Sequence, residues 1–419
     1  MLDDSGQYLK IQGFIMDCQI PNGGGKGFKM LYFDIQEYKS RIEKTKKRMA
    51  AEGIDVLFIS QPANMNYLTG YDGWSFYVHQ GVIVSVDQEE PIWVGRAMDA
   101  NGARLTTFLK DEDIFSYSDD YVQSRLKHPM QVVADIIREK GWGKKTIAVE
   151  MDQFYFTHRC FIELEKALPE AKFKDGNILV NKVRLIKSDQ EIEFMKKAGK
   201  IAERVIEAGI NAVNIGVREC DAAAEISYAQ IKGTKEFGGD YPAIVPLMMA
   251  GEGTSTPHLT WSDRKFQNNE AVLLELSGVY KHYHAPIART IYLGEPPKLM
   301  RNTVDVVIDG LNKTLEFIKP GITCEEVEAK WREAISHSTV VKESRLGYSI
   351  GLNYPPDWGE QTVSLRPGDK TVLQPNMAFH IIPGIWYKEV GFEVDASVRI
   401  AENGYESLYN FPIELFVKK

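Results

Sequence analysis

The sequence is poor in several features that would assign it to a specialised class of protein. Only four of its 419 residues are cysteines, and they are widely spaced, without a CxxC pair or a zinc-finger spacing. This pattern indicates free thiols and no disulfide framework. No run of 18 apolar residues is present, and the first residues lack the charged start and apolar block of a secretory signal. A cytoplasmic protein without a spanning helix is therefore expected.

Positive charge is scarce as well. The net charge is −8, and no dense stripe of lysine and arginine offsets it, which argues against a nucleic-acid partner. Apolar residues make up 44% of the chain and charged residues 26%, as in ordinary soluble globular proteins. The length predicts two or three domains with room for a large core.

The chain is predicted to contain an N-terminal extension followed by two domains. Residues 1–29 form the extension, and their glycine-rich stretch favours a flexible conformation. Residues 30–183 alternate between helical and strand patterns, which indicates an α/β domain. In residues 184–419, two pairs of helices flank antiparallel strands, which indicates an α+β domain of two similar halves. Helices are expected at 35–51, 130–140, 155–168, 192–209, 219–232, 300–318 and from 324 onward, and strands at 55–60, 81–86, 91–94, 271–278, 283–293, 372–382 and 391–400.

One acidic residue interrupts the most apolar of these strands. Glu275 lies within the run 271–278, where burial alone would favour leucine or valine. A buried carboxylate needs a partner or takes up a proton. His258, in a loop 17 residues upstream, is expected to lie near it across a hairpin. The two form either a catalytic pair or a satisfied structural pair.

A turn-rich aromatic segment at residues 71–80 is the second candidate for function. Its members include Trp74, Phe76 and Tyr77. Aromatic clusters usually belong to a core, but the glycine and polar residues within this one favour a surface or a pocket wall.

Several motifs of the second domain resemble those of the creatinase, prolidase and methionine-aminopeptidase family. They include the segment 185–192 that leads into the second domain, the turn at 347–351 and the strand at 375–384. The resemblance covers residues from about 31 to 415. It implies an α/β N-terminal domain followed by the α+β catalytic domain called the pita-bread fold.

The departures from the family pattern concern its metal site. Peptidases of this family hold two divalent ions with two Asp, one His and two Glu. The resemblance places these five ligands at Glu275, Pro286, Tyr348, Ile382 and Asp395. Proline and isoleucine offer no side-chain ligand and tyrosine is a poor one, so the two remaining carboxylates are too few for a dinuclear site. No metal and no cofactor are therefore expected.

Within the family, the chain resembles the metal-free ectoine hydrolases. The resemblance is carried by residues 66–77, 95–100 and 257–261 and by Glu275. It implies hydrolysis of a ring C–N bond of ectoine to an N-acetylated diaminobutyrate, a homodimer whose partner subunit completes the pocket, and functional pairing with a deacetylase. Hydroxyectoine is a further possible substrate.

The predicted pocket is acidic, with imidazole nearby and no cation to offset it, which suits a small cationic or zwitterionic substrate. Its expected lining is His258, Glu275, Tyr348, His380, Glu393 and Asp395. Trp74, Phe76 and Tyr77 are expected to close over the ring.

Roles for these side chains follow from the chemistry of an amidinium group. His258 is expected to carry the proton that the leaving nitrogen needs. Glu275 either pairs with the amidinium or attacks its carbon. Glu393 and Asp395, which alternate on one strand, are expected to hold the ring N–H groups. His282 and His284 are expected to be solvated or structural.

Two other classes of function remain open. One is a metal-dependent Xaa-Pro aminopeptidase or prolidase with a different ligand set, or a creatinase-like amidinohydrolase, although Ala288 and Ile382 stand where creatinase has acids. The other is a non-catalytic pita-bread module that binds proteins. Such a module has no need of His258 and Glu275 together.

Overall fold

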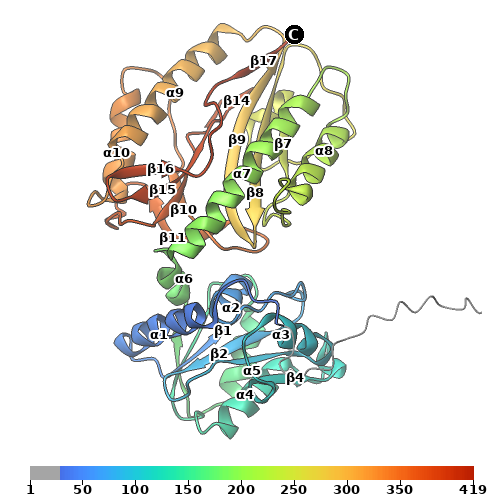
Figure 1. The fold of residues 1–419 in the computed structure, drawn as a ribbon, viewed down its shortest axis with the longest axis vertical. Helices are drawn as coiled ribbons and strands as arrows, with labels where there is room; N and C mark the ends of the chain where they lie inside the picture. Colours follow the sequence, from blue (N-terminus) through green and yellow to red (C-terminus); the bar gives the residue numbers. More distant parts are fainter. Residues whose placement is uncertain (1–28) are drawn as a thin grey trace, which may run out of the picture.

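The structure, a computed structural model, describes residues 29–419 and places them in two domains (Figure 1). The predicted extension at 1–29 lies, apart from Lys29, outside the described residues. The short helix α6 (Leu179–Arg184) leads from the N-terminal domain into the C-terminal domain. The predicted boundary between residues 183 and 184 falls at the end of this helix.

The N-terminal domain is a six-stranded mixed sheet with helices on both faces. The strand order is β4-β3-β2-β1-β5-β6, and β1 runs antiparallel to β2 and parallel to β5. Alternate residues of β1 face opposite sides, so Phe58 packs with α4 and α5 while Leu57 packs in the core around α1. The elements are α1 (Ile35–Ala51), β1 (Val56–Ile59), α2 (Pro62–Thr69), β2 (Gly81–Ser85), β3 (Ile92–Arg96), η1 (Ala97–Asp99), α3 (Ala100–Thr106), η2 (Asp111–Asp113), β4 (Ile114–Tyr117), η3 (Asp119–Tyr121), α4 (Pro129–Glu139), β5 (Thr146–Val149), α5 (His158–Ala167) and β6 (Lys172–Asp175).

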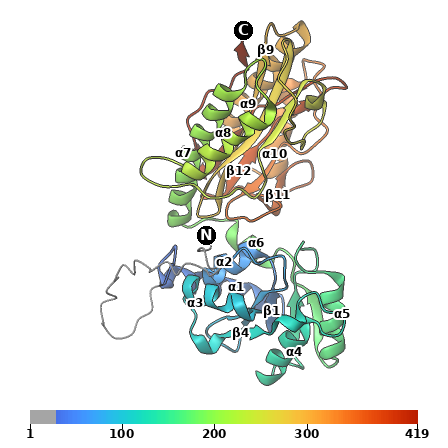
Figure 2. The ribbon, with the colours of Figure 1, turned by 90° about the vertical axis from the view of Figure 1, so that its right-hand side faces the viewer.

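The C-terminal domain holds two larger antiparallel-rich sheets with a helix pair outside each (Figures 1 and 2), and a separate two-stranded sheet of β13 and β14. One sheet has the order β17-β9-β8-β7 and the other β11-β10-β12-β15-β16. The elements are α7 (Asp189–Ala212), α8 (Glu219–Lys232), β7 (Leu247–Ala250), η4 (Gly251–Ser255), β8 (Glu270–Tyr280), β9 (Tyr283–Leu293), α9 (Lys298–Phe317), α10 (Cys324–Ile335), β10 (Gly347–Ile350), β11 (Gly359–Leu365), β12 (Ala378–Ile381), β13 (Ile385–Trp386), β14 (Gly391–Phe392), β15 (Ala396–Ala401), β16 (Gly404–Ser407) and β17 (Phe416–Lys418). This arrangement confirms the predicted fold class.

Local sequence signals explain where the helices of this domain begin. Ser188 and Thr323 each form a capping box with the glutamate three residues later, which satisfies backbone N–H groups at the start of α7 and α10. The apolar stripe of α7 then packs on β8 and β9. A Cβ on Gly278 would lie 2.1 Å from the Ala198 carbonyl oxygen, so only glycine allows this helix to approach the sheet so closely.

Two predicted strands are shorter than their sequence patterns indicate. The strand expected at 372–382 exists only as β12, because Pro375 and Asn376 form a turn in which Asn376 has a positive φ of 66°. The strand expected at 391–400 is divided into β14 and β15. Between them, the Glu393 backbone binds the side chain of Thr290 through both its N–H and its carbonyl group, at 2.9 and 2.8 Å. These two hydrogen bonds to a side chain replace the backbone–backbone hydrogen bonds of a regular strand.

Buried polar groups connect the two domains. Arg41 of α1 lies 3.7 Å from a Glu191 oxygen, and Tyr283 donates a hydrogen bond to the same carboxylate at 2.8 Å. At the tip of the β8–β9 hairpin, His282 Nε2 lies 3.0 Å from Asp72 Oδ1 of the N-terminal domain. His284 is also buried, and its Nε2 accepts a hydrogen bond from the Ala243 N–H. The structural interpretation of the two histidines fits these contacts.

The cysteines and the helices of residues 29–419 agree with the expectations of free thiols and of no spanning helix. Three cysteines lie in this part of the chain, at positions 160, 220 and 324, and all three are free thiols, as predicted. In the same residues, every helix is too short or too polar to cross a membrane.

Candidate active site

A cavity of about 870 Å³ lies in the C-terminal domain. Glu275 of β8 and Tyr348 of β10 both line it, so each of the two sheets contributes a side chain. Glu393 and His258 also line this space. The fold therefore brings together four of the site residues predicted from the sequence.

Glu275 is held in the wall of the cavity by the alternation of β8. Its neighbours Leu274 and Leu276 point into the core beneath α7, so Glu275 faces the opposite side of the sheet. The pKa of Glu275 is raised to about 7, mainly by burial, with smaller contributions from the charges of Asp395 and Asp357 and an opposing one from His380. This confirms the expectation of a buried acid with an altered proton affinity.

Glu393 is the most isolated acid of the cavity. Its side chain is 0% exposed, and within residues 29–419 neither carboxylate oxygen has a hydrogen-bond partner. Burial raises the pKa of Glu393 well above the ordinary value, and the negative charge of Glu275 raises it further. Two buried carboxylates that repel each other do not readily ionise together. One of Glu275 and Glu393 is therefore expected to stay protonated until a cation enters the cavity.

His258 lies at the exposed side of the cavity, in the loop after η4. Its backbone has a φ of 70°, which is uncommon outside glycine and costs about 1–3 kcal/mol. An exposed imidazole can exchange protons with water and still reach into the cavity, as its predicted role requires.

Asp395 and His380 lie behind the cavity wall and are absent from its lining. Asp395 Oδ2 lies 2.5 Å from His380 Nε2, while Oδ1 accepts hydrogen bonds from Arg289 at 3.0 Å and from Tyr409 at 2.9 Å. All the charge of Asp395 is therefore committed within the protein. The predicted contact of Asp395 and His380 with substrate is not what the structure shows, because their polar atoms already have partners.

A chain of hydrogen bonds connects this buried group to the cavity. Tyr348 OH accepts a hydrogen bond from Trp358 Nε1 at 2.9 Å and lies 3.1 Å from His380 Nδ1. If His380 Nε2 donates to Asp395, then Nδ1 is free to accept the tyrosine proton. Tyr348 thereby presents a fixed ring, not a free hydroxyl, to the space beside Glu275.

The predicted aromatic residues lie outside the cavity of their own chain. Trp74 and Tyr77 are exposed, and Phe76 is half-buried. Trp74 packs against Tyr241, with ring centroids 4.8 Å apart. The aromatic segment thus contacts the C-terminal domain beside the hairpin tip, and its contact with substrate stays a prediction.

Sequence reasoning missed two basic residues of the cavity. Lys342 and Arg345 both line it, so the expectation of an acidic pocket without any cation is wrong. Burial lowers the pKa of Lys342 to about 8, and its ammonium group donates to Ser344 Oγ at 2.9 Å. The Arg345 guanidinium lies 4.3 Å from the centroid of the Tyr348 ring. Both residues belong to the irregular segment between α10 and β10, where no periodicity indicates which side chains point inward.

Comparison with known proteins identifies the family. The model of the metallopeptidase family M24 matches residues 193–404, and the model of the creatinase/prolidase N-terminal domain matches residues 41–186. The chain belongs to the M24 family, with the N-terminal domain that creatinases and prolidases share. The predicted family is therefore confirmed.

Individual relatives agree with this assignment. The chain is 44% identical to an ectoine hydrolase of Halomonas elongata, over 93% of this chain and 99% of the relative. It is also 44% identical to an uncharacterised hydrolase/peptidase of Sinorhizobium fredii, over 93% and 100% of the two chains. A solved prolidase structure from Thermococcus sibiricus covers 91% of this chain and 99% of its own, with a TM-score of 0.79 and 22% identity. This last comparison supports the fold.

The two metal ions implied by the family name do not fit the residues of this cavity. The side chains of Pro286 and Ile382 have no ligand atoms, and the oxygens of Asp395 are already bound by Arg289, Tyr409 and His380. Within residues 29–419, the cluster of three or more side chains suited to a metal ion lies in the N-terminal domain instead.

Proposed function

We propose that the chain is a hydrolase that opens the cyclic amidine ring of ectoine and that works without a metal ion. The observation that carries this proposal is the pairing of charges around one cavity, with Glu275 and Glu393 as acids and Lys342 and Arg345 as bases. Ectoine is a zwitterion with an amidinium group and a carboxylate, and each has a counterpart among these residues. The 44% identity to an ectoine hydrolase supports the same substrate.

The proposed reaction adds one water molecule across a ring C–N bond. The amidinium carbon gains an oxygen, the bond from that carbon to one ring nitrogen breaks, and the freed nitrogen leaves as an amine. The product is an N-acetylated 2,4-diaminobutyrate. Its acetyl group is the substrate that a deacetylase would require, which supports the proposed functional pairing.

Each cavity residue has a distinct task in this scheme. Glu275 faces the amidinium carbon, where its carboxylate either attacks or stabilises the positive charge. Glu393 holds a ring N–H, because its oxygens have no other partner within the described residues. His258 delivers the proton to the leaving nitrogen. Lys342 and Arg345 bind the carboxylate of the substrate, which fixes the ring in one orientation.

The proposed enzyme is a homodimer in which the aromatic segment of one subunit closes the cavity of the other. The support is that Trp74 and Tyr77 are exposed and outside their own cavity. Mixing inactive Trp74→Ala and His258→Ala variants should restore activity, because a mixed dimer contains one cavity with both native residues. No recovery in dimers shown to be mixed, or an active monomer in sedimentation, would contradict this arrangement.

A substrate comparison tests the function itself. The purified protein is incubated with ectoine, hydroxyectoine, creatine and an Xaa-Pro dipeptide, and the products are followed by mass. We expect ectoine to gain the mass of one water molecule, both with and without a strong chelator. Cleavage of the dipeptide alone, or activity that disappears with the chelator and returns with manganese or cobalt, would support a metallopeptidase instead.

A further inference from the structure

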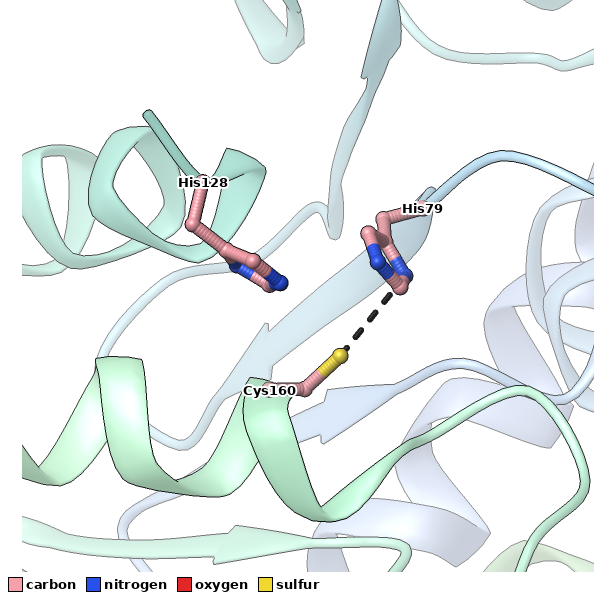
Figure 3. Close-up of side chains that lie close together, drawn as sticks. All are labelled: His79, His128 and Cys160. Carbon is pink, nitrogen blue, oxygen red and sulfur yellow. Dashed lines mark hydrogen bonds between the residues drawn. The ribbon is translucent and has the colours of Figure 1, made fainter. Parts of the chain in front are cut away.

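Three side chains that commonly bind metals meet in the N-terminal domain, away from the cavity. Figure 3 shows His79, which precedes β2, His128 at the start of α4, and Cys160 in the first turn of α5. One ligand atom from each residue lies within 4.8 Å of the other two, and His79 Nδ1 is 3.6 Å from Cys160 Sγ. Three separate segments of the chain therefore point their donor atoms at one place.

We propose that His79, His128 and Cys160 form a binding site for a thiophilic transition-metal ion of the Zn²⁺ type. Two imidazoles and one thiolate match the preference of zinc for nitrogen and sulfur ligands and do not suit Ca²⁺ or Mg²⁺. A tetrahedral zinc ion with bonds of about 2.0–2.3 Å places its ligand atoms about 3.5 Å apart. His79 Nδ1 and Cys160 Sγ, 3.6 Å apart, already have this separation, and the three ligand atoms lie within 4.8 Å of one another, so small side-chain shifts suffice to close the site.

The fourth position of the ion would be taken by water. His79 and His128 are half-buried, whereas Cys160 is 1% exposed, so solvent reaches the site from the side of the histidines. None of the three residues lines the catalytic cavity. The proposal is thus independent of the proposed function, and an ion bound here takes no part in the ring opening.

His128 also caps the start of α4, so binding of a metal ion by this residue is expected to change the hydrogen bonding of that helix. Its Nδ1 accepts a hydrogen bond from the Met130 N–H at 3.2 Å and so caps α4. The other ring nitrogen, Nε2, is then the one available to an ion (Figure 3). Coordination through Nε2 moves the ring proton to Nδ1, which can no longer accept the hydrogen bond. Binding of the ion is therefore coupled to a rearrangement at the start of α4.

The site would anchor a segment of the N-terminal domain that contacts the C-terminal domain. His79 belongs to the aromatic segment 71–80, in which Trp74 packs on Tyr241 and the ring centroids of Phe76 and Tyr354 are 6.3 Å apart. An ion that holds His79 to α4 and α5 thereby restrains these contacts with the C-terminal domain. Loss of the ion is expected to lower thermal stability and leave the catalytic residues in place.

Zinc titration of the full-length, metal-stripped protein tests the proposal. We expect one Zn²⁺ per chain, a higher melting temperature on binding, and, with Co²⁺ as a spectroscopic probe, a thiolate-to-metal charge-transfer band. Cys160→Ser and His128→Asn should each lose the bound ion. Asparagine is a good N-cap, so His128→Asn removes the ligand and preserves the helix start.

Two kinds of control separate this site from others. His158→Gln, in the same helix as Cys160, and Cys220→Ser should retain the ion and the charge-transfer band. Zinc that survives both Cys160→Ser and His128→Asn, or the absence of stoichiometric binding to the parent protein, would overturn the proposal. Zinc that is lost in Glu275→Gln instead would place the ion in the catalytic cavity and would also overturn the metal-free reaction. Failure of the zinc site with intact ectoine hydrolysis would leave the proposed function standing.

Discussion

Glu393 and Asp395 are two residues apart, and both are 0% exposed, yet their surroundings are opposite. Asp395 is bound by Arg289, Tyr409 and His380. Glu393 lines the cavity, and its oxygens have no hydrogen-bond partner within residues 29–419. Burial of a carboxylate is costly unless it is paired. The paired acid therefore stabilises the fold, whereas the unpaired one is retained at a cost that substrate binding can offset.

This comparison extends to Glu275, which shares the cavity with Glu393. Its pKa of about 7 lies in the range where a carboxyl group can be either an acid or a base at neutral pH. Perturbed groups inside a cavity are candidates for function. The difference between the cavity acids and the acid behind them can be tested by replacing each with its amide.

The largest effect is expected from Glu275→Gln. If the carboxylate attacks the amidinium carbon, the amide variant should lose about 10⁴-fold or more in turnover and still bind ectoine. Intact-protein mass spectrometry during turnover should then show an adduct of substrate mass on the parent protein. Weaker binding with residual turnover would instead assign Glu275 a purely electrostatic role. Near-normal kinetics would make it structural and would remove the basis of the comparison.

The next effect concerns stability and should be opposite for the two neighbouring acids. Asp395→Asn leaves the buried Arg289 charge without its partner, which is expected to cost about 3–5 kcal/mol of unfolding free energy. Glu393→Gln removes no pairing and should be neutral or stabilising. Denaturant unfolding of both variants at neutral pH measures the difference. Equal destabilisation would show that Glu393 has partners after all.

Measuring stability as a function of pH tests whether burial raises the pKa of Glu275. Its pKa in the folded protein is raised from 4.5 to about 7, so the folded state binds the proton more tightly than the unfolded state. The associated stability is fully present below pH 4.5 and is lost as the pH rises through 7. Glu275→Gln should therefore gain stability relative to the parent protein between these values, by about 3 kcal/mol at pH 8. A pH-independent difference would mean that the carboxyl group ionises normally.

The smallest effect is expected at the basic side of the cavity. Lys342→Met should raise the KM for ectoine by about 10–100-fold, because a charge-assisted bond to the substrate carboxylate is lost. An ectoine analogue without the carboxylate should bind both proteins equally. Lys370→Met, an exposed lysine outside the cavity, serves as the matched control. An unchanged KM would assign the carboxylate to Arg345 or to another group.

The pH dependence of activity should also depend on Lys342. The carboxylate form of Glu275 accumulates as the pH rises through about 7, and the Lys342 cation is lost above about 8. Activity should therefore rise through the first value and fall beyond the second. Lys342→Met should remove the alkaline fall, whereas Lys370→Met should leave it unchanged.

Much of this protein was predictable from its sequence. The periodicity of α7 and the capping boxes at Ser188 and Thr323 mark helix positions through local interactions, and the acid within β8 stands out against its apolar neighbours. Motifs at residues 185–192, 347–351 and 375–384 indicated the family, which the comparisons confirm. Such signals are readable because the residues that produce them are close together along the chain.

The environment of each side chain was decided by the tertiary structure alone. Sequence placed Glu393 and Asp395 on one face of a single strand, but the Thr290 side chain interrupts that strand between β14 and β15. Partners from β9 and β12 then satisfy Asp395, and none of the described residues satisfies Glu393. Likewise, an irregular segment brings Lys342 to the cavity. Burial and pairing depend on residues far apart in the sequence, so charge balance at the site could be determined only after the chain had folded.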